Sequence, residues 1–177
     1  MESVRNYQQL HASLDKEIGL SELDFLKILL QRASLLIAHS QDDEAKRCMQ
    51  VCNLFLQKQP PSPTDLDTAK EMFLNYGDEE SLQPPHLDYY YAMPLLLALS
   101  VTEFAISESP EVFQHACDQY ETMLQVASAL LDTRSLYEID AREVSQHLAS
   151  GVIDNTTFRQ FSELLQDPDW PKAYGER

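Results

Sequence analysis

Apolar side chains recur at every third or fourth position through most of this sequence, which is the spacing that lines one face of an α-helix. Near the N-terminus this spacing is followed by Val4, Tyr7, Leu10, Leu14 and Ile18. No window alternates apolar and polar residues with the β-branched enrichment of a strand, and no Asn-Gly or Asp-Gly turn joins two apolar runs. The pattern therefore predicts an all-α protein.

Capping residues predict where the first helices begin and end. Gly19 closes the first, and Ser21 with Asp24 begins a second helix that is apolar on nearly all sides and that we expect at the centre of the core. Asp42 and Asp43 begin a third helix, which Pro60 stops. Thr64 with Asp67 predicts a capping box for a fourth helix.

The second half of the chain is predicted in the same way. A fifth helix covers roughly residues 87–107, and Pro94 within it predicts a kink or a fresh start. Ser109-Pro110-Glu111 begins a sixth helix of about 20 residues. Asp140 with Glu143 is interpreted as the capping box of a shorter segment closed by Gly151. A last helix follows Asn155 and Thr156.

These segments predict a single-domain globular bundle of about seven or eight helices around the second, fifth and sixth. The length of 177 residues suits one domain. We expect the helical domain to cover residues 1–166, and residues 167–177 to form a C-terminal tail.

The net charge of −16 constrains the partners that this chain can attract. An acidic surface repels phosphate backbones and anionic lipid head groups, so neither nucleic acid nor a membrane is expected as a partner. The N-terminus lacks the features of a secretory signal, and the apolar stretch Ala92–Val101 is far shorter than the ~20 residues of a membrane span. A cytoplasmic protein with a basic protein partner is the expectation, and a homodimer is left open.

The negative charge is concentrated in the middle of the sequence. From Glu71 through Thr133 there is no Lys or Arg, whereas the same span contains eleven Asp and Glu residues. Such a field can steer a cationic partner, although acids also simply keep a bundle soluble. Three consecutive tyrosines lie in this span and cannot all face inward on a helix, so at least one should be exposed. The candidate partner-binding residues are Asp78, Glu79, Glu80, Asp88, Tyr89, Tyr90 and Tyr91.

Residues that could carry chemistry form only weak patterns. Glu111, His115 and Asp118 can share a helix face and offer metal ligands, but a solvated face explains them as well. Cys48 and Cys52 lie one turn apart on an apolar stripe, where core packing is the simpler explanation. No catalytic or nucleotide-binding motif occurs, so we expect no enzyme, no cofactor, no catalytic residue and no metal site.

The order of four segments resembles that of the YjaG-like family of small all-helical bacterial proteins. The segments are FLKILLQRASL, LDTAKEMFLNYG, DYYYAMPLLLALSVTEFAIS and FQHACDQYETMLQVASALL. Phe25, Leu29 and Arg32 approximate the family's F-x-x-x-L-x-x-R pattern, whereas AHSQDDE replaces its aromatic and Asn-rich turn. The resemblance implies a cytosolic α-helical fold of unknown function, without catalytic residues.

Three functional hypotheses remain. The first is a binding protein that neutralises a basic partner, most concretely an immunity protein against a bacterial toxin such as a nuclease. The second is a housekeeping adaptor or regulator of the YjaG-like type, as a homodimer, whose charge gives only solubility. The third is a metal-binding helical protein or enzyme that uses Glu111, His115 and Asp118, or the Cys48 and Cys52 pair.

Overall fold

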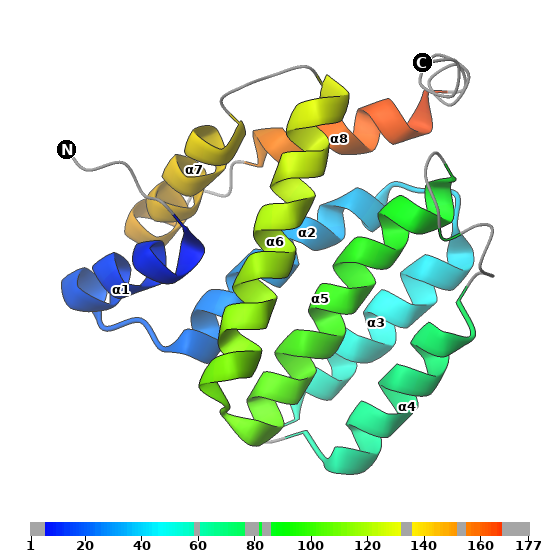
Figure 1. Ribbon diagram of the computed structural model, residues 1–177, viewed down its shortest axis with the longest axis horizontal. Helices are drawn as coiled ribbons and strands as arrows, with labels where there is room; N and C mark the ends of the chain where they lie inside the picture. The colour runs from blue at the N-terminus through cyan, green and yellow to red at the C-terminus, as the bar shows by residue number, and fades with distance from the viewer. Residues whose placement is uncertain are drawn as a thin grey trace.

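The computed structural model of the chain describes residues 6–58, 61–76, 82, 86–131, 136–151 and 155–167 (Figure 1). Within these ranges the chain forms eight α-helices and no strand, which confirms the predicted all-α bundle. The helices are α1 (Tyr7–Ile18), α2 (Glu22–Ala38), α3 (Asp43–Gln57), α4 (Pro63–Leu74), α5 (Leu87–Ser107), α6 (Pro110–Leu131), α7 (Leu136–Ser150) and α8 (Thr156–Gln166). Of the predicted tail, only Asp167 lies among the described residues.

The three helices predicted at the centre, α2, α5 and α6, pack against one another. Every other described helix packs against at least one of them: α3 and α4 against α5, α1 and α7 against α6, and α8 against both α2 and α6. Figure 1 shows the resulting division, with α3 and α4 on one side of α5, α1 and α7 on the other side of α6, and α8 crossing behind the end of α6. The bundle therefore has two unequal halves that share one core.

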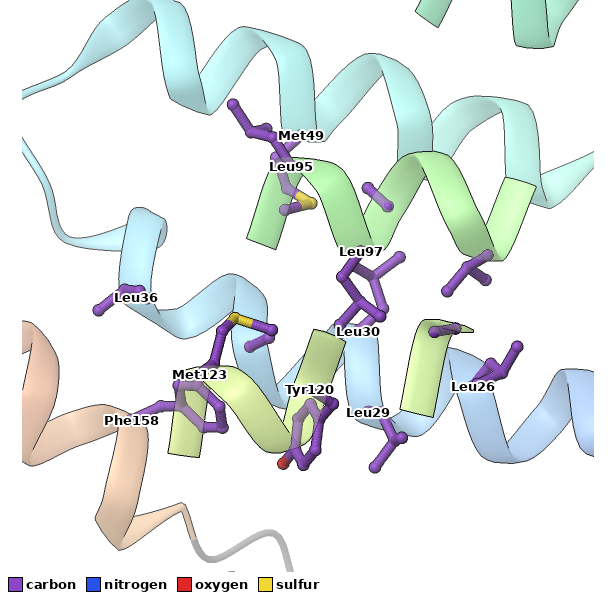
Figure 2. Close-up of a cluster of buried hydrophobic side chains, with 14 of the residues drawn as sticks. Leu26, Leu29, Leu30, Leu36, Met49, Leu95, Leu97, Tyr120, Met123 and Phe158 are labelled. Atoms are coloured by element: carbon purple, nitrogen blue, oxygen red, sulfur yellow. The ribbon is translucent and has the colours of Figure 1, made fainter. Parts of the chain in front are cut away.

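The core is built mainly from leucine and aromatic side chains of the central helices (Figure 2). Leu26, Leu29, Leu97, Tyr120 and Phe158 are all fully buried there. Burying each leucine or phenylalanine stabilises the fold by about 1.5–3 kcal/mol. The core thus explains why α5 is apolar on almost every side, since other helices surround it.

Helix α5 is the one described helix that is long and apolar enough to cross a membrane by length and composition alone. In the bundle, 61% of that apolar window is buried against other helices, as in the core helix of a globular protein. The helix runs through Pro94 without a new start, so of the two predicted alternatives only a kink remains. Pro94 is itself buried in the core.

Side-chain caps stabilise the starts of the first four helices. Ser21 accepts a hydrogen bond from the Asp24 backbone N–H and Asp42 accepts one from Ala45, as predicted. The fourth helix is capped two residues earlier than predicted, by a capping box between Ser62 and Asp65. The reason is that Pro63 occupies the first helical position, where its missing N–H and fixed φ are an advantage.

Candidate partner-binding surface and the buried polar network

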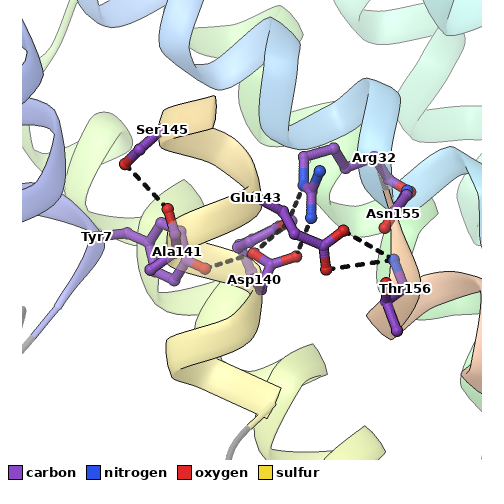
Figure 3. A network of polar contacts seen from close by, with 9 residues as sticks. Tyr7, Arg32, Asp140, Ala141, Glu143, Ser145, Asn155 and Thr156 are labelled. Carbon is purple, nitrogen blue, oxygen red and sulfur yellow. Dashed lines mark hydrogen bonds and ion pairs between the residues drawn. The ribbon is translucent and has the colours of Figure 1, made fainter. Parts of the chain in front are cut away.

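An ion pair joins α2 to α7 in the larger half of the bundle, which also contains α1, α6 and α8. Arg32 of α2 donates from its Nη2 to Oδ1 of Asp140 in α7 at 2.5 Å, and both side chains are at most 1% exposed (Figure 3). Burial alone would lower the pKa of Arg32, but Tyr120 and Asp140 raise it above its ordinary value, so the guanidinium stays charged. A charge buried this deeply requires such a partner.

Two tyrosine hydroxyls complete the shell around the Asp140 carboxylate. Tyr120 of α6 donates to Oδ2 at 2.8 Å, and Tyr7 of α1 donates to the same oxygen. Burial, reinforced by the charge of Asp140, raises the pKa of both tyrosines, so both remain proton donors at neutral pH. Asp140 therefore connects four helices: α1, α2, α6 and α7.

A second carboxylate of α7 stabilises the start of the next helix. Both oxygens of Glu143 accept from the backbone N–H of Thr156, at 2.9 and 3.2 Å, where Asn155 makes no side-chain cap. Asn155 donates instead to the carbonyl of Arg32 at 2.9 Å. Glu143 of α7 thus supplies the acceptor that a local cap supplies at other helices.

The prediction that Asp140 and Glu143 cap their own helix is therefore wrong. Helix α7 begins at Leu136, and both acids lie within its body, facing the core. Two acids three residues apart share one helix face whether they cap the helix or face the core, so their spacing does not distinguish the two roles. Their partners in the structure are not neighbours in the sequence. Because the ion pair is closed to solvent and its charges cancel, its role is to hold the helices together.

A different tyrosine–carboxylate cluster lies where α3 begins, α4 has ended and α5 begins. The hydroxyl of Tyr76 donates to Oδ2 of Asp42 at 2.7 Å and lies 3.4 Å from Oδ1 of Asp88. Burial and these two carboxylates raise the pKa of Tyr76. Among the described residues, no Lys or Arg forms an ion pair with Asp42 or Asp88. We call Asp42, Tyr76 and Asp88 the acidic end cluster.

The three predicted tyrosines next to this cluster differ in exposure. Tyr90 and Tyr91 are only 4% and 2% exposed, and the Tyr90 ring packs edge-on against Phe161 of α8 and against Tyr89. Tyr89 is half-buried and keeps part of its ring at the surface. The candidate residues Asp78, Glu79 and Glu80 lie outside the described residues.

A cleft of about 200 Å³ separates α5 from α6 at the surface. Its apolar wall is formed by Met93 and Leu96 of α5. Its polar wall on α6 is formed by His115, Asp118, Gln119 and Thr122. A larger groove of about 450 Å³ lies between α2 and α3 and is lined by Lys27, Leu30, Gln31, Ser34, Asn53, Leu56 and Gln57.

The residues considered as metal ligands make other contacts. His115 Nε2 lies 3.1 Å from the Gln119 amide, and a Glu111 oxygen accepts from Ser109 at 2.7 Å. Within the part of the chain that is described, no three His, Cys, Asp or Glu side chains are grouped closely enough to hold a metal ion.

The three cysteines are buried, and burial keeps their thiols protonated. Cys48 and Cys52 are each 5% exposed, on the face of α3 that packs into the bundle. Burial raises the pKa of Cys52 to about 12, and it also raises the pKa of Cys48 and of the fully buried Cys117. At neutral pH all three are thiols, whereas nucleophiles and metal ligands are thiolates.

No protein-family model matches the chain, and no curated protein or solved structure is significantly similar to it. The resemblance to the YjaG-like family stays a prediction.

Proposed function

We propose that this chain is a non-enzymatic protein that binds a basic protein partner, most concretely an immunity protein that neutralises a basic toxin such as a nuclease. The observation that carries the proposal is the charge of two adjacent helices. Residues 87–131, which form α5 and α6, contain six Asp and Glu residues and no Lys or Arg. As part of the same proposal, the protein is bacterial and acts in the cytoplasm.

The acidic end cluster supports this proposal from geometry. Asp42 and Asp88 approach a single tyrosine hydroxyl, and no Lys or Arg in the described part of the chain forms an ion pair with either of them. Like charges held this close repel one another in the free protein. A lysine or arginine of a partner would relieve that repulsion, which gives a basic protein an advantage over a neutral one.

The mode of action follows from the chemistry of nucleic-acid binding. Toxins that act on nucleic acid use Lys and Arg to hold phosphates. Carboxylates on α5, together with the candidate residues Glu79 and Glu80, would pair with those cations and block the substrate. Tyr89 adds a rigid, partly exposed aromatic ring to the surface, whereas Tyr90 and Tyr91 contribute by fixing the packing beneath it.

Affinity capture with the tagged full chain, from its native host at low and at high salt, tests the proposal. We expect one basic protein that is retained at low salt and released at high salt, because exposed charge pairs are screened. That protein should be toxic when expressed alone and harmless when this chain is co-expressed. Capture of no basic protein at either salt would overturn the proposal.

Charge reversal then tests the location. Replacing Glu79, Glu80 and Asp88 by Lys should weaken partner binding by at least about tenfold, since charge-assisted contacts at interfaces cost 2 kcal/mol or more to lose. The matched control reverses Glu17, Glu138 and Glu163, three exposed acids on α1, α7 and α8, and changes the net charge equally. Equal weakening by both triple variants would point to a general charge effect and against the site.

A further inference from the structure

We infer that the cleft between α5 and α6 receives an arginine side chain of the basic partner. Its alkyl stem would lie on Met93 and Leu96, and its guanidinium would lie at Asp118. This inference rests on the proposed function and names the anchoring contact within it. A cleft of about 200 Å³ is smaller than the ~300–1,000 Å³ of ordinary ligand pockets and suits a single side chain.

Helical spacing aligns the two walls of the cleft. Tyr89, Met93 and Leu96 follow one another at four and three residues, so they form one stripe along α5. On α6, His115, Asp118 and Thr122 follow at three and four residues and form the opposing stripe. The partly exposed tyrosine of the candidate site and the cleft therefore share one face of α5.

The surroundings of the cleft select a cation. Asp118 is exposed on α6, and no Lys or Arg occurs on either helix that forms the cleft. The Thr122 hydroxyl donates to the Asp118 carbonyl at 2.9 Å, which leaves its lone pairs able to accept. The α2/α3 groove has the opposite character, because its one charged lining residue is Lys27 and no acid lines it.

Arginine suits this arrangement better than lysine. Its planar guanidinium offers five N–H donors and is weakly hydrated, so it can bond Asp118 while lying on apolar atoms. Leu96 is 37% exposed, so an apolar surface is available to the alkyl stem. A second copy of this chain does not fit, because a symmetric dimer through this face would place acidic surfaces against each other.

The test uses a small probe and residue-resolved detection. The probe is the acetylated, amidated tripeptide Leu-Arg-Leu, titrated into the isotope-labelled full chain while backbone amide shifts are followed by NMR. We expect saturable shifts that centre on Leu96, His115 and Thr122 and that leave the α2/α3 groove unchanged. The same peptide with citrulline, which keeps the shape and loses the charge, should bind at least about fivefold more weakly.

Two conservative variants locate the contact. Asp118→Asn should weaken binding of the arginine peptide about five- to tenfold, which is the loss of one charge-assisted contact, and Leu96→Ala should weaken it about threefold. The matched controls are Glu163→Gln on α8 and Leu54→Ala on α3, which change an exposed acid and an exposed leucine elsewhere. These should leave the affinity unchanged.

The outcomes separate this inference from the proposed function. Shifts spread over the whole acidic surface, or equal binding of the citrulline peptide, would overturn the cleft assignment. If a basic partner is captured and responds to the Glu79, Glu80 and Asp88 reversal but not to Asp118→Asn, the function stands and the cleft assignment fails. If the arginine peptide binds the cleft but no partner is captured, the cleft assignment stands and the proposed function fails.

Discussion

The described residues form two clusters in which a tyrosine hydroxyl donates to an aspartate, and the two clusters differ in one component. Around Asp140, an arginine completes the cluster, the charges cancel and solvent is excluded. In the acidic end cluster, Tyr76 meets Asp42 and Asp88 with no arginine or lysine paired to them among the described residues. The first cluster contains its own cation, whereas the second has no paired cation among the described residues, and the proposed function assigns that place to a group of the partner.

This difference suits the two clusters to different roles: the Asp140 cluster to stabilising the fold, and the acidic end cluster to the binding role that we propose. A carboxylate whose partners are all internal can be fully buried and stabilises one arrangement of helices. A carboxylate pair without a cation raises the free energy of the unbound protein, and that energy is recovered when a basic group binds. On the proposed function, the two halves of the bundle use the same kinds of side chain for different purposes, stability in one and binding in the other.

The largest effect should come from breaking the buried ion pair. Arg32→Met leaves Asp140 charged and buried with only its tyrosine donors, so the free energy of unfolding should fall by about 3–5 kcal/mol. Urea unfolding followed by circular dichroism measures it. The matched control is Arg142→Met, an exposed arginine on the same helix as Asp140, which should change stability by less than ~0.5 kcal/mol. A loss below 1 kcal/mol for Arg32→Met would contradict the role given to the network.

High pH should weaken the fold through the tyrosines of both clusters. The pKa of Tyr7, Tyr76 and Tyr120 is raised in the folded protein, so the unfolded chain loses its phenolic protons first, near the ordinary value of 10.0. The stability that these groups contribute is complete below pH 10.0 and declines as the pH rises above it, by about 1.4 kcal/mol per pH unit for each tyrosine.

The free energy of unfolding, measured between pH 9 and 11, checks this decline, because that range extends roughly one unit on either side of the ordinary pKa of tyrosine. In Tyr120→Phe the free energy of unfolding should decline less steeply with pH, by the contribution of one tyrosine, about 1.4 kcal/mol per pH unit. The variant should also be less stable than the original protein at neutral pH. An equally steep decline in Tyr120→Phe would show that this tyrosine is not responsible.

The smallest effect should be a gain in stability at the acidic end cluster. Asp88→Asn removes one of two neighbouring like charges, so the free energy of unfolding should rise by up to about 0.5–1 kcal/mol at low salt and less at high salt. The same variant should bind the basic partner more weakly. A loss of stability in Asp88→Asn would contradict the idea that the pair is repulsive in the free protein.

The sequence predicted those features whose causes are local. Ser21 and Asp42 cap helices through contacts with residues three positions away, and the apolar stripes identified the central helices. Asp140 was misinterpreted because its decisive partner, Arg32, is 108 residues away, and nothing in the spacing distinguishes an inward acid from a capping one. The signal was the position of Arg32, which shares one stripe of α2 with the apolar residues Leu29 and Leu36, so a buried counter-charge had to exist elsewhere.

Only part of the candidate surface could be predicted from the sequence, because the rest depends on contacts between distant segments. The absence of Lys and Arg from α5 and α6 is visible in the sequence, but the cleft depends on which faces of the two helices meet. Counting three adjacent tyrosines correctly indicated that one keeps surface exposure. Which one it is depends on α8, because Phe161 covers Tyr90.

The contact between Tyr7 and Asp140 also bears on the order in which the chain can fold during synthesis. These residues are separated by 133 positions, so the N-terminal helix leaves the ribosome long before its carboxylate partner exists. Until α7 has emerged, Arg32 lacks the carboxylate of Asp140, and α1 lacks one of its polar contacts to the bundle. The helices of the smaller half, α3 to α5, lie between them in the sequence and can assemble first. The last third of the chain then closes the structure, because α7 packs against α1 and α8 packs against α2.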